Sequence, residues 1–250
     1  KTNSNGRTLG NFLIGWPKDS LAQFCISTTE PDFEVCQNYF CIPDMNVFDA
    51  FKHFRKAKRS PILDCMNTAA NTRILTSRPS IKTATKALIR HVVWKNRWDS
   101  EEFRNWVDEF KADVVLVMNS DSAFLLEIAR KISERKAIPL VMYNTEGFYF
   151  FEQDYMKEIS FIDKASFCLY KRIYRNAFRK LMQKTSLSMH LNGKLCKDFK
   201  EEFGGKHEVL YSSSSMKNKE YVCDYNNPIF NYLGNFGFDR ASALLDIADV

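Results

Sequence analysis

The sequence predicts an α/β protein in which a parallel, Rossmann-like sheet is flanked by helices. Two observations support this class. From about residue 105, short apolar runs of strand length alternate with segments whose apolar residues recur at helical spacing. The first of these runs, residues 114–118, is an unbroken aliphatic stretch, which is typical of a parallel strand covered on both faces.

Composition limits the class of protein further. The chain has 250 residues, of which 45% are hydrophobic and 26% charged, enough for one full core and part of another. These values exclude wholesale disorder, and no apolar run is long enough to predict a membrane span. Seven cysteines without a C-x-x-C pair and four histidines without ligand spacing predict unpaired thiols, a reducing cytoplasm and no metal site.

The N-terminal third is the least regular part of the sequence. Residues 5–15 predict a turn at Gly6 that leads into a helix, because Leu9, Phe12 and Leu13 follow at helical spacing. Residues 21–27 predict a short buried strand, and a second short apolar run lies in the turn-rich stretch after it. Residues 52–98 are basic and poor in acids.

Residues 114–143 form the clearest unit, a strand, a helix and a second strand. Ser120 or Asp121 is expected to cap the helix, whose apolar positions recur every three or four residues. Pro139 marks the end of the helix, and the second strand is "LVMY". This order predicts a crossover between parallel strands.

The same alternation continues toward the C-terminus. Residues 186–191 predict a strand, 193–204 a helix and the stretch from 207 another strand. The polar, unpatterned residues 212–228 then predict a linker that is closed by a proline. A final strand and glycine turn follow it.

Polar residues directly follow three of the predicted strands. In a parallel sheet the carboxyl ends of the strands are the usual place for a ligand. The residues selected by this rule are Asn119, Ser120, Asp121, Asn144, Thr145, Glu146 and Asn192. Glu146, next to Gly147, has the chemistry to accept a proton or to bind a sugar hydroxyl. Ser120 and Asp121 have an alternative interpretation as simple helix caps.

The closing turn has two interpretations. Gly234, Gly237 and Arg240 lie between an apolar strand and an apolar-patterned helix. Glycines let the backbone approach phosphate oxygens, and an arginine at a helix start adds a two-pronged donor. A strand-to-helix turn that binds no ligand has the same pattern.

Residues 164–184 contain seven Lys or Arg and no acid, with an apolar stripe at helical spacing. One interpretation is a surface helix whose charges are solvated. The other is a peripheral contact with anionic lipid headgroups, supported by the basic residues before 98. No motif for nucleic-acid binding accompanies these charges.

Taken in order, these parts resemble bacterial GT-B glycosyltransferases of the family-four type. The resemblance rests on "NSNGRTLGNFL", on "YNTEGFYF" at the end of the strand–helix–strand unit, on "EVLYSSS", on the linker and on "FNYLGNFGFDRASALLDIA". In that family two Rossmann-like domains face each other across a cleft. The resemblance implies an acceptor-side domain at 1–227 and the start of a donor-side domain at 228–250, with the first strand and later parts missing.

The resemblance also implies roles for individual residues. Asn5, Gly6 and Arg7 would bind the donor diphosphate from one side, and Gly234, Asn235, Gly237 and Arg240 from the other. Glu146 would contact the acceptor or act as its base, and Asp121 would orient it. The family's pair of closely spaced glutamates, which belongs to the second domain, does not occur here, so the chain alone is expected to be inactive.

The resemblance therefore predicts a cytoplasmic hexosyltransferase of polysaccharide biosynthesis. It would move a sugar, with retention, from a nucleotide-sugar to a glycan or lipid-linked acceptor, without a cofactor or metal. The alternative from another class is a non-catalytic α/β module that docks on acidic partners or membranes. A nucleotide-dependent oxidoreductase is disfavoured, because no G-x-G-x-x-G follows an early strand.

Overall fold

A computed structural model describes residues 4–26, 31, 33–42, 83–95, 97–151 and 161–212. The chain separates into two compact units, one of residues 1–152 with 158–213 and the other of residues 153–157 with 214–250. All the described residues belong to the first unit. The predicted second domain at 228–250 lies outside the described residues, as does most of the basic stretch before residue 83.

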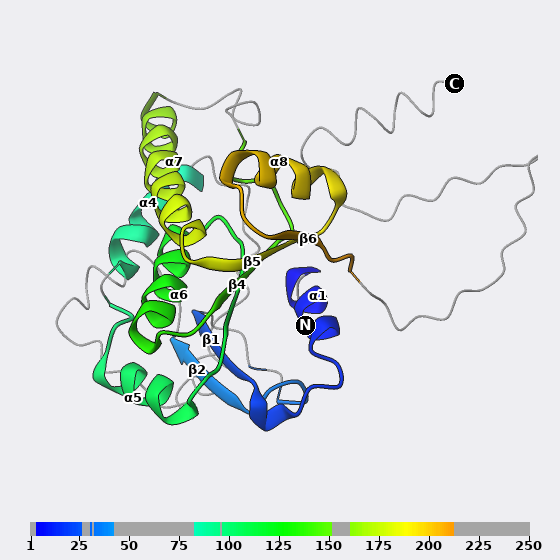
Figure 1. Ribbon diagram of the computed structural model, residues 1–250. Helices are drawn as coiled ribbons and strands as arrows, with labels where there is room; N and C mark the ends of the chain where they lie inside the picture. The colour runs from blue at the N-terminus through cyan, green and yellow to red at the C-terminus, as the bar shows by residue number, and fades with distance from the viewer. Residues whose placement is uncertain are drawn as a thin grey trace, which may run out of the picture. The chain divides into compact units, whose positions relative to one another are not determined.

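The main sheet has four strands in the order β3-β4-β5-β6, and every pairing is parallel (Figure 1). The strands are β3 (Val115–Met118), β4 (Leu140–Asn144), β5 (Thr185–His190) and β6 (His207–Val209). Helices α6 (Ala123–Lys136), α7 (Phe161–Met182) and α8 (Gly193–Phe203) stand between them in the chain. The predicted α/β class with a parallel sheet flanked by helices is confirmed.

A smaller parallel pair is formed by β1 (Ala22–Ile26) and β2 (Asn38–Ile42). Near it lie α4 (Thr83–Trp94) and α5 (Glu101–Phe110), and the ring of Phe103 meets those of Phe24 and Phe40 at centroid distances of 4.9 and 5.2 Å. This aromatic cluster joins the pair to α5 and, through Phe124, to α6.

The N-terminal elements are α1 (Ser4–Phe12) and the short 3-10 helix η1 (Lys18–Ser20). The predicted turn at Gly6 is wrong, because the helix already begins at Ser4 and includes Asn5, Gly6 and Arg7. Apolar spacing locates the body of a helix but not its first turn, where side chains need not pack.

The start of α6 also differs from the prediction. Its N-cap is Ser122 rather than Ser120 or Asp121, and the Ser122 hydroxyl does not cap the helix. That hydroxyl donates to Asp121 Oδ1 and accepts from Arg90. The backbone N–H of Ala123 donates instead to the hydroxyl of Tyr170, at 3.2 Å. The helix is therefore capped by a residue of another helix.

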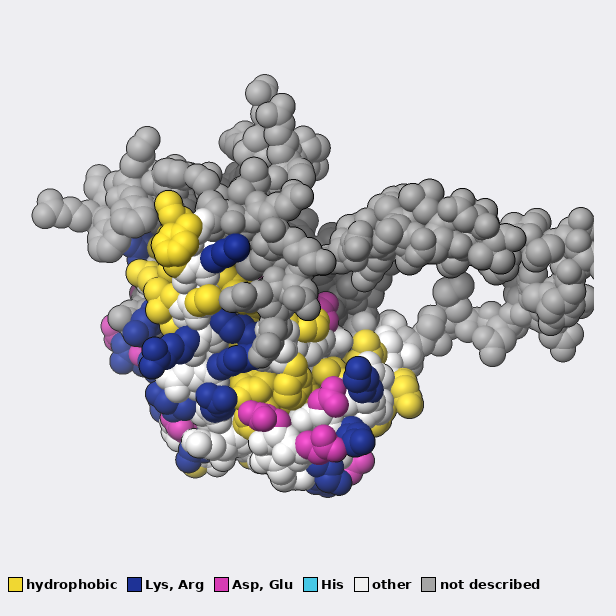
Figure 2. Space-filling model, turned by 90° about the horizontal axis from the view of Figure 1, so that it is seen from above, with side chains coloured by type: hydrophobic (Ala, Val, Ile, Leu, Met, Phe, Trp, Pro, Cys, Tyr) yellow, Lys and Arg dark blue, Asp and Glu magenta, His cyan; other side chains and the backbone are white. Residues whose placement is uncertain are grey.

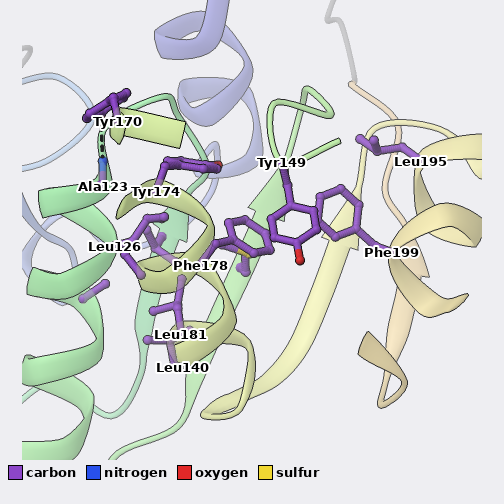
Figure 3. Packing of buried hydrophobic residues seen from close by; sticks show 14 residues of the cluster. Ala123, Leu126, Leu140, Tyr149, Tyr170, Tyr174, Phe178, Leu181, Leu195 and Phe199 are labelled. Atoms are coloured by element: carbon purple, nitrogen blue, oxygen red, sulfur yellow. Dashed lines mark hydrogen bonds between the residues drawn. The ribbon is translucent and has the colours of Figure 1, made fainter. Parts of the chain in front are cut away.

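The core lies on one face of the four-stranded sheet. Side chains alternate along each strand, so Leu140 and Met142 point to the same face as Val117. They pack against the buried stripe of α7 and against α6 and α8, including Leu126, Tyr174, Phe178, Leu181 and Phe199 (Figure 3). In Figure 1, α6 and α7 lie on one side of the strands and α1 on the other.

The opposite face is less covered. Phe12 of α1 packs its ring edge-on against Tyr143, with 4.8 Å between the ring centroids. Leu116 of β3 is 40% exposed. The prediction that the 114–118 run is covered on both faces is therefore wrong for Val114 and Leu116, which are 45% and 40% exposed on the less covered face.

Candidate functional site at the carboxyl edge of the sheet

The parallel sheet brings the ends of β3, β4 and β5 to one edge. The backbone N–H of Asn119 donates to Tyr143 O at 2.8 Å, and the N–H of Leu191 donates to Asn144 O at 3.0 Å. These bonds continue the strand pairing one residue beyond β3 and β5. The polar residues that follow the strands are therefore held at neighbouring positions, as the sequence predicts.

Two tyrosines of α7 fix the residues after β3. Tyr174, which is fully buried, donates to Asn119 Oδ1 at 2.8 Å. Tyr170 donates to the backbone carbonyl of Asp121 and accepts from the N–H of Ala123 (Figure 3). Asn119 is itself buried, so its side chain is engaged in this network and is not open to a ligand.

Asp121 and Glu146 are exposed, and both act on the same tyrosine. Burial raises the pKa of Tyr174, and the negative charges of Asp121 and Glu146 raise it further. Burial likewise raises the pKa of Tyr170 to about 12. Both hydroxyls stay protonated at physiological pH and act as neutral donors. The exposed carboxylates of Asp121 and Glu146 therefore lie near two buried, neutral tyrosine hydroxyls.

Glu146 is followed by the aromatic turn, residues 147–151. The backbone N–H groups of Phe150 and Phe151 donate to Gly147 O at 2.8 and 3.2 Å. Lys171 donates to Phe148 O and lies 4.4 Å from the centre of the Phe148 ring. The Nε of Arg175 donates to Tyr149 O at 3.1 Å. Cations of α7 therefore hold the backbone of the turn that follows Glu146.

A polar row is buried at the ends of β4 and β5. Asn144 and His190 are register partners on the two strands, and both are fully buried. Asn144 Nδ2 donates to Ser188 Oγ at 3.0 Å. His207 donates from Nε2 to Gly204 O at 2.7 Å, which leaves its Nδ1 to accept from His190 Nε2 at 2.9 Å.

Burial, with a smaller contribution from His207, lowers the pKa of His190 to about 4, so His190 is neutral. Three buried atoms at these strand ends have no hydrogen-bond partner in the described part of the chain: Asn144 Oδ1, Thr145 Oγ1 and His190 Nδ1. The two unpaired atoms of Asn144 and His190 are acceptors, and the Thr145 hydroxyl can both accept and donate.

The other predicted site residues take different positions in the structure or lie outside the described residues. Asn192 caps α8, since its Oδ1 accepts from the Leu195 N–H at 2.9 Å, and Ser120 accepts from the Ser122 N–H. Thr8 of α1 lies 3.4 Å from the Ser212 hydroxyl, just beyond β6, so α1 approaches the same edge. Gly234, Asn235, Gly237 and Arg240 lie outside the described residues.

The cationic helix α7 has the predicted amphipathic form. Its stripe of Phe167, Tyr170, Tyr174, Ala177, Phe178 and Leu181 is buried. Its exposed side changes character along the helix. Phe161, Ile162 and Leu169 are 86, 70 and 51% exposed in its first half, whereas Arg172, Arg179 and Lys180 are exposed further along. Figure 2 shows hydrophobic and basic side chains beside each other on this side of the molecule.

Sequence reasoning missed Tyr170, Tyr174, Lys171, His190 and Ser188 as parts of this edge. In the sequence, Tyr170 and Tyr174 were interpreted only as core positions of a helix. Lys171 read as part of a solvated face, although it lies four residues after Phe167 and three before Tyr174. That spacing puts it on the buried stripe and could have identified it.

No protein-family model matches the chain, and comparisons with curated proteins and with solved structures gave no significant match. Among residues 4–26, 31, 33–42, 83–95, 97–151 and 161–212, no three His, Cys, Asp or Glu side chains are arranged to hold a metal ion. Within those same ranges, no helix has the length and apolar character needed to cross a bilayer.

Proposed function

We propose that the protein is a glycosyltransferase of the two-domain GT-B type and that the described residues belong to its acceptor-side domain. The reaction is transfer of a sugar from a nucleotide-sugar to a hydroxyl of a glycan or lipid-linked acceptor. One observation carries the proposal. Asp121 and Glu146 are both exposed at the carboxyl edge of a parallel sheet, and both carboxylates raise the pKa of the buried Tyr174.

In this reaction Glu146 accepts the hydrogen bond, and then the proton, of the acceptor hydroxyl, and Asp121 orients the acceptor. The neutral hydroxyls of Tyr170 and Tyr174 hold Asp121 and Asn119 in place. Lys171 and Arg175 hold the turn that follows Glu146. Rigid support of this kind keeps the reacting groups within the narrow range of geometry that transfer requires.

The donor side of the reaction rests on the family resemblance alone. It assigns the leaving diphosphate to Asn5, Gly6 and Arg7 and to the turn with Gly234, Asn235, Gly237 and Arg240. Helix N-termini and an arginine stabilise such an anion without a metal. This assignment, the retaining outcome and the cytoplasmic location remain predictions.

The test of Glu146 uses the complete protein with a panel of nucleotide-sugars and measures the release of nucleoside diphosphate in the presence of glycan or lipid-linked acceptors. Glu146→Gln keeps the size of the side chain and removes the base, so turnover should fall by roughly 100-fold or more. Glu109→Gln, an exposed position on α5, is the matched control and should keep the parent rate. Near-normal turnover of Glu146→Gln would remove Glu146 from the mechanism.

A second candidate function follows from the exposed side of α7. Exposed Phe161, Ile162 and Leu169 next to Lys164 and Arg172 have the composition of a helix that binds at the headgroups of anionic lipids. This contact would bring a transferase to a lipid-linked acceptor. By itself, without transfer, it would make the protein a non-catalytic module that docks on membranes.

Flotation of the chain with phosphatidylcholine vesicles, with and without phosphatidylglycerol, tests this contact. Binding should require the anionic lipid and should fall several-fold in the double variant Ile162→Ser with Leu169→Ser. Ile14→Ser, another exposed apolar position, is the control and should bind like the parent. If the chain does not bind anionic vesicles, the charged side chains of α7 are simply solvated. If they are bound while the complete protein transfers no sugar, the docking module is the better account.

A further inference from the structure

Two cysteines face each other across the small parallel pair. Cys25 of β1 and Cys41 of β2 are register partners, and neither is in a disulfide. Partners on neighbouring strands lie about 4.8 Å apart, which is within the Cα separation that a disulfide requires. Phe24 and Phe40 point to the opposite side, toward Phe103 of α5. The two thiols therefore meet on the side of the pair away from that aromatic cluster.

The chemistry of the two thiols differs from that of their neighbour Cys36. The Cys25 thiol hydrogen-bonds to Cys41 and lowers the pKa of the Cys41 thiol, which favours the thiolate. The Cys36 thiol donates to the carbonyls of Leu21 and Asn38, at 3.1 and 3.4 Å. Burial raises the pKa of Cys36, so this thiol stays protonated. Of the three, Cys25 is partly exposed, whereas Cys36 and Cys41 are buried.

We propose that Cys25 and Cys41 are an oxidisable dithiol that closes a cross-strand disulfide between β1 and β2. The oxidant is a low-molecular-weight disulfide such as oxidised glutathione. The Cys25 thiol passes its proton to the neighbouring Cys41 thiolate and attacks one sulfur of the small disulfide. A mixed disulfide forms, and the small thiolate that leaves takes up that proton from Cys41. The thiolate of Cys41 then attacks the Cys25 sulfur and releases the second.

The exchange balances without any further reagent. The two cysteine sulfurs lose two electrons, the small disulfide gains them, and the two cysteine protons end on the two released thiols. Cys25 is the entry point because a small disulfide can reach a partly exposed sulfur, and Cys41 completes the exchange because its thiol already contacts Cys25. Cys36 takes no part.

The test uses the full chain with Cys65, Cys168, Cys196 and Cys223 replaced by serine, so that Cys25, Cys36 and Cys41 remain. Incubation with oxidised glutathione should give a product that has lost two hydrogen atoms and carries no glutathione. Trypsin leaves all three cysteines on one peptide, since no Lys or Arg lies between Lys18 and Lys52. Cleavage after Glu34 and after Tyr39 separates them and should reveal one linked pair, Cys25 with Cys41.

Single substitutions in that background distinguish the pair from the third cysteine. Cys36→Ser should form the disulfide as fully as the parent, because the serine hydroxyl can donate to the same carbonyls. Cys25→Ser and Cys41→Ser should form none, and at most one glutathione should be retained. Circular dichroism of each reduced variant shows whether it is folded before oxidation.

A link that involves Cys36, or glutathione retained on the three-cysteine protein with no internal disulfide, would overturn the proposal. If Cys36→Ser proves unfolded, alkylation of the oxidised three-cysteine protein decides the matter. One free thiol should then be labelled, and it should be Cys36. Label on Cys25 or Cys41 would contradict the assignment.

Discussion

The two faces of the four-stranded sheet differ sharply, although they come from the same strands. On the face toward α6, α7 and α8, Leu140, Met142, Asn144 and His190 are all fully buried. On the other face Tyr143 is buried, but Leu116 is 40% exposed and Val141, Leu187 and Met189 are only partly covered. The closed face thus includes polar groups in its core, and the open face leaves aliphatic groups partly in water.

This difference indicates that the closed face contributes most of the stability of the sheet and of the candidate site. A fully packed face allows little relaxation, and each of its two fully buried polar residues, Asn144 and His190, has one paired and one unpaired polar atom. The open face can absorb a change of side chain because solvent already reaches it. Variants that make the same chemical change on each face measure the difference.

The largest effect is expected from matched leucines in two strands. Leu140→Ala on the closed face should lower the free energy of unfolding by about 2–5 kcal/mol, because it leaves a cavity in a packed core. Leu116→Ala on the open face should cost less than about 1.5 kcal/mol. Urea unfolding measures both. Equal losses would mean that Leu116 is as well packed as Leu140 in solution.

A smaller effect is expected from the two tyrosine hydroxyls. Tyr174→Phe removes the donor to the buried Asn119 Oδ1 and should lower the free energy of unfolding by about 1–3 kcal/mol. Tyr143→Phe removes a bond to Leu210 O, which is only partly buried, and should cost about 0.5–1.5 kcal/mol. The same unfolding measurement compares them, and a larger loss for Tyr143→Phe would reverse the comparison.

A third effect is limited to acid pH. The pKa of His190 is about 4 in the folded protein, below the ordinary value of about 6.5 that the unfolded chain has. The unfolded chain therefore binds the proton first as pH falls, and the contribution of neutral His190 to stability is lost between about pH 6.5 and 4. His190→Asn does not titrate there and should flatten the dependence of unfolding free energy on pH.

Circular dichroism at neutral pH is the control for this variant, because a misfolded protein would also change the slope. If folded His190→Asn and the parent lose stability in parallel between those pH values, His190 is not buried as a neutral side chain in solution.

Local sequence signals were enough to predict the regular elements of the sheet. β3 and β4 are largely apolar runs, and β5 alternates polar and apolar residues; clear breaks bound them, such as Pro139 before β4 and Asn192 after β5. The rule for carboxyl ends then predicted Asn119, Asp121, Asn144 and Glu146 at one edge. Both inferences rest on alternation and chain order, which a single sequence contains.

What escaped prediction depends on contacts between distant residues. The cap of α6 is the hydroxyl of Tyr170, which lies 47 positions after Ala123. The residues near Ala123 in the sequence therefore do not predict this cap. Asn192 was predicted as a site residue because it is polar and follows a strand, but its side chain caps α8. The start of α1 at Ser4 and the exposure of Leu116 also depend on packing, which the apolar pattern does not specify.

The bonds from α7 to the aromatic turn end on backbone carbonyls, those of Phe148 and Tyr149. Every amino acid supplies such a carbonyl, so these two bonds do not depend on which side chains the turn carries. The side chains that hold the loop after Glu146 belong to Lys171 and Arg175, which lie 23 positions after Phe148 and 26 positions after Tyr149. The side chains of the turn can therefore change without the loss of these two bonds, provided that Lys171 and Arg175 are kept.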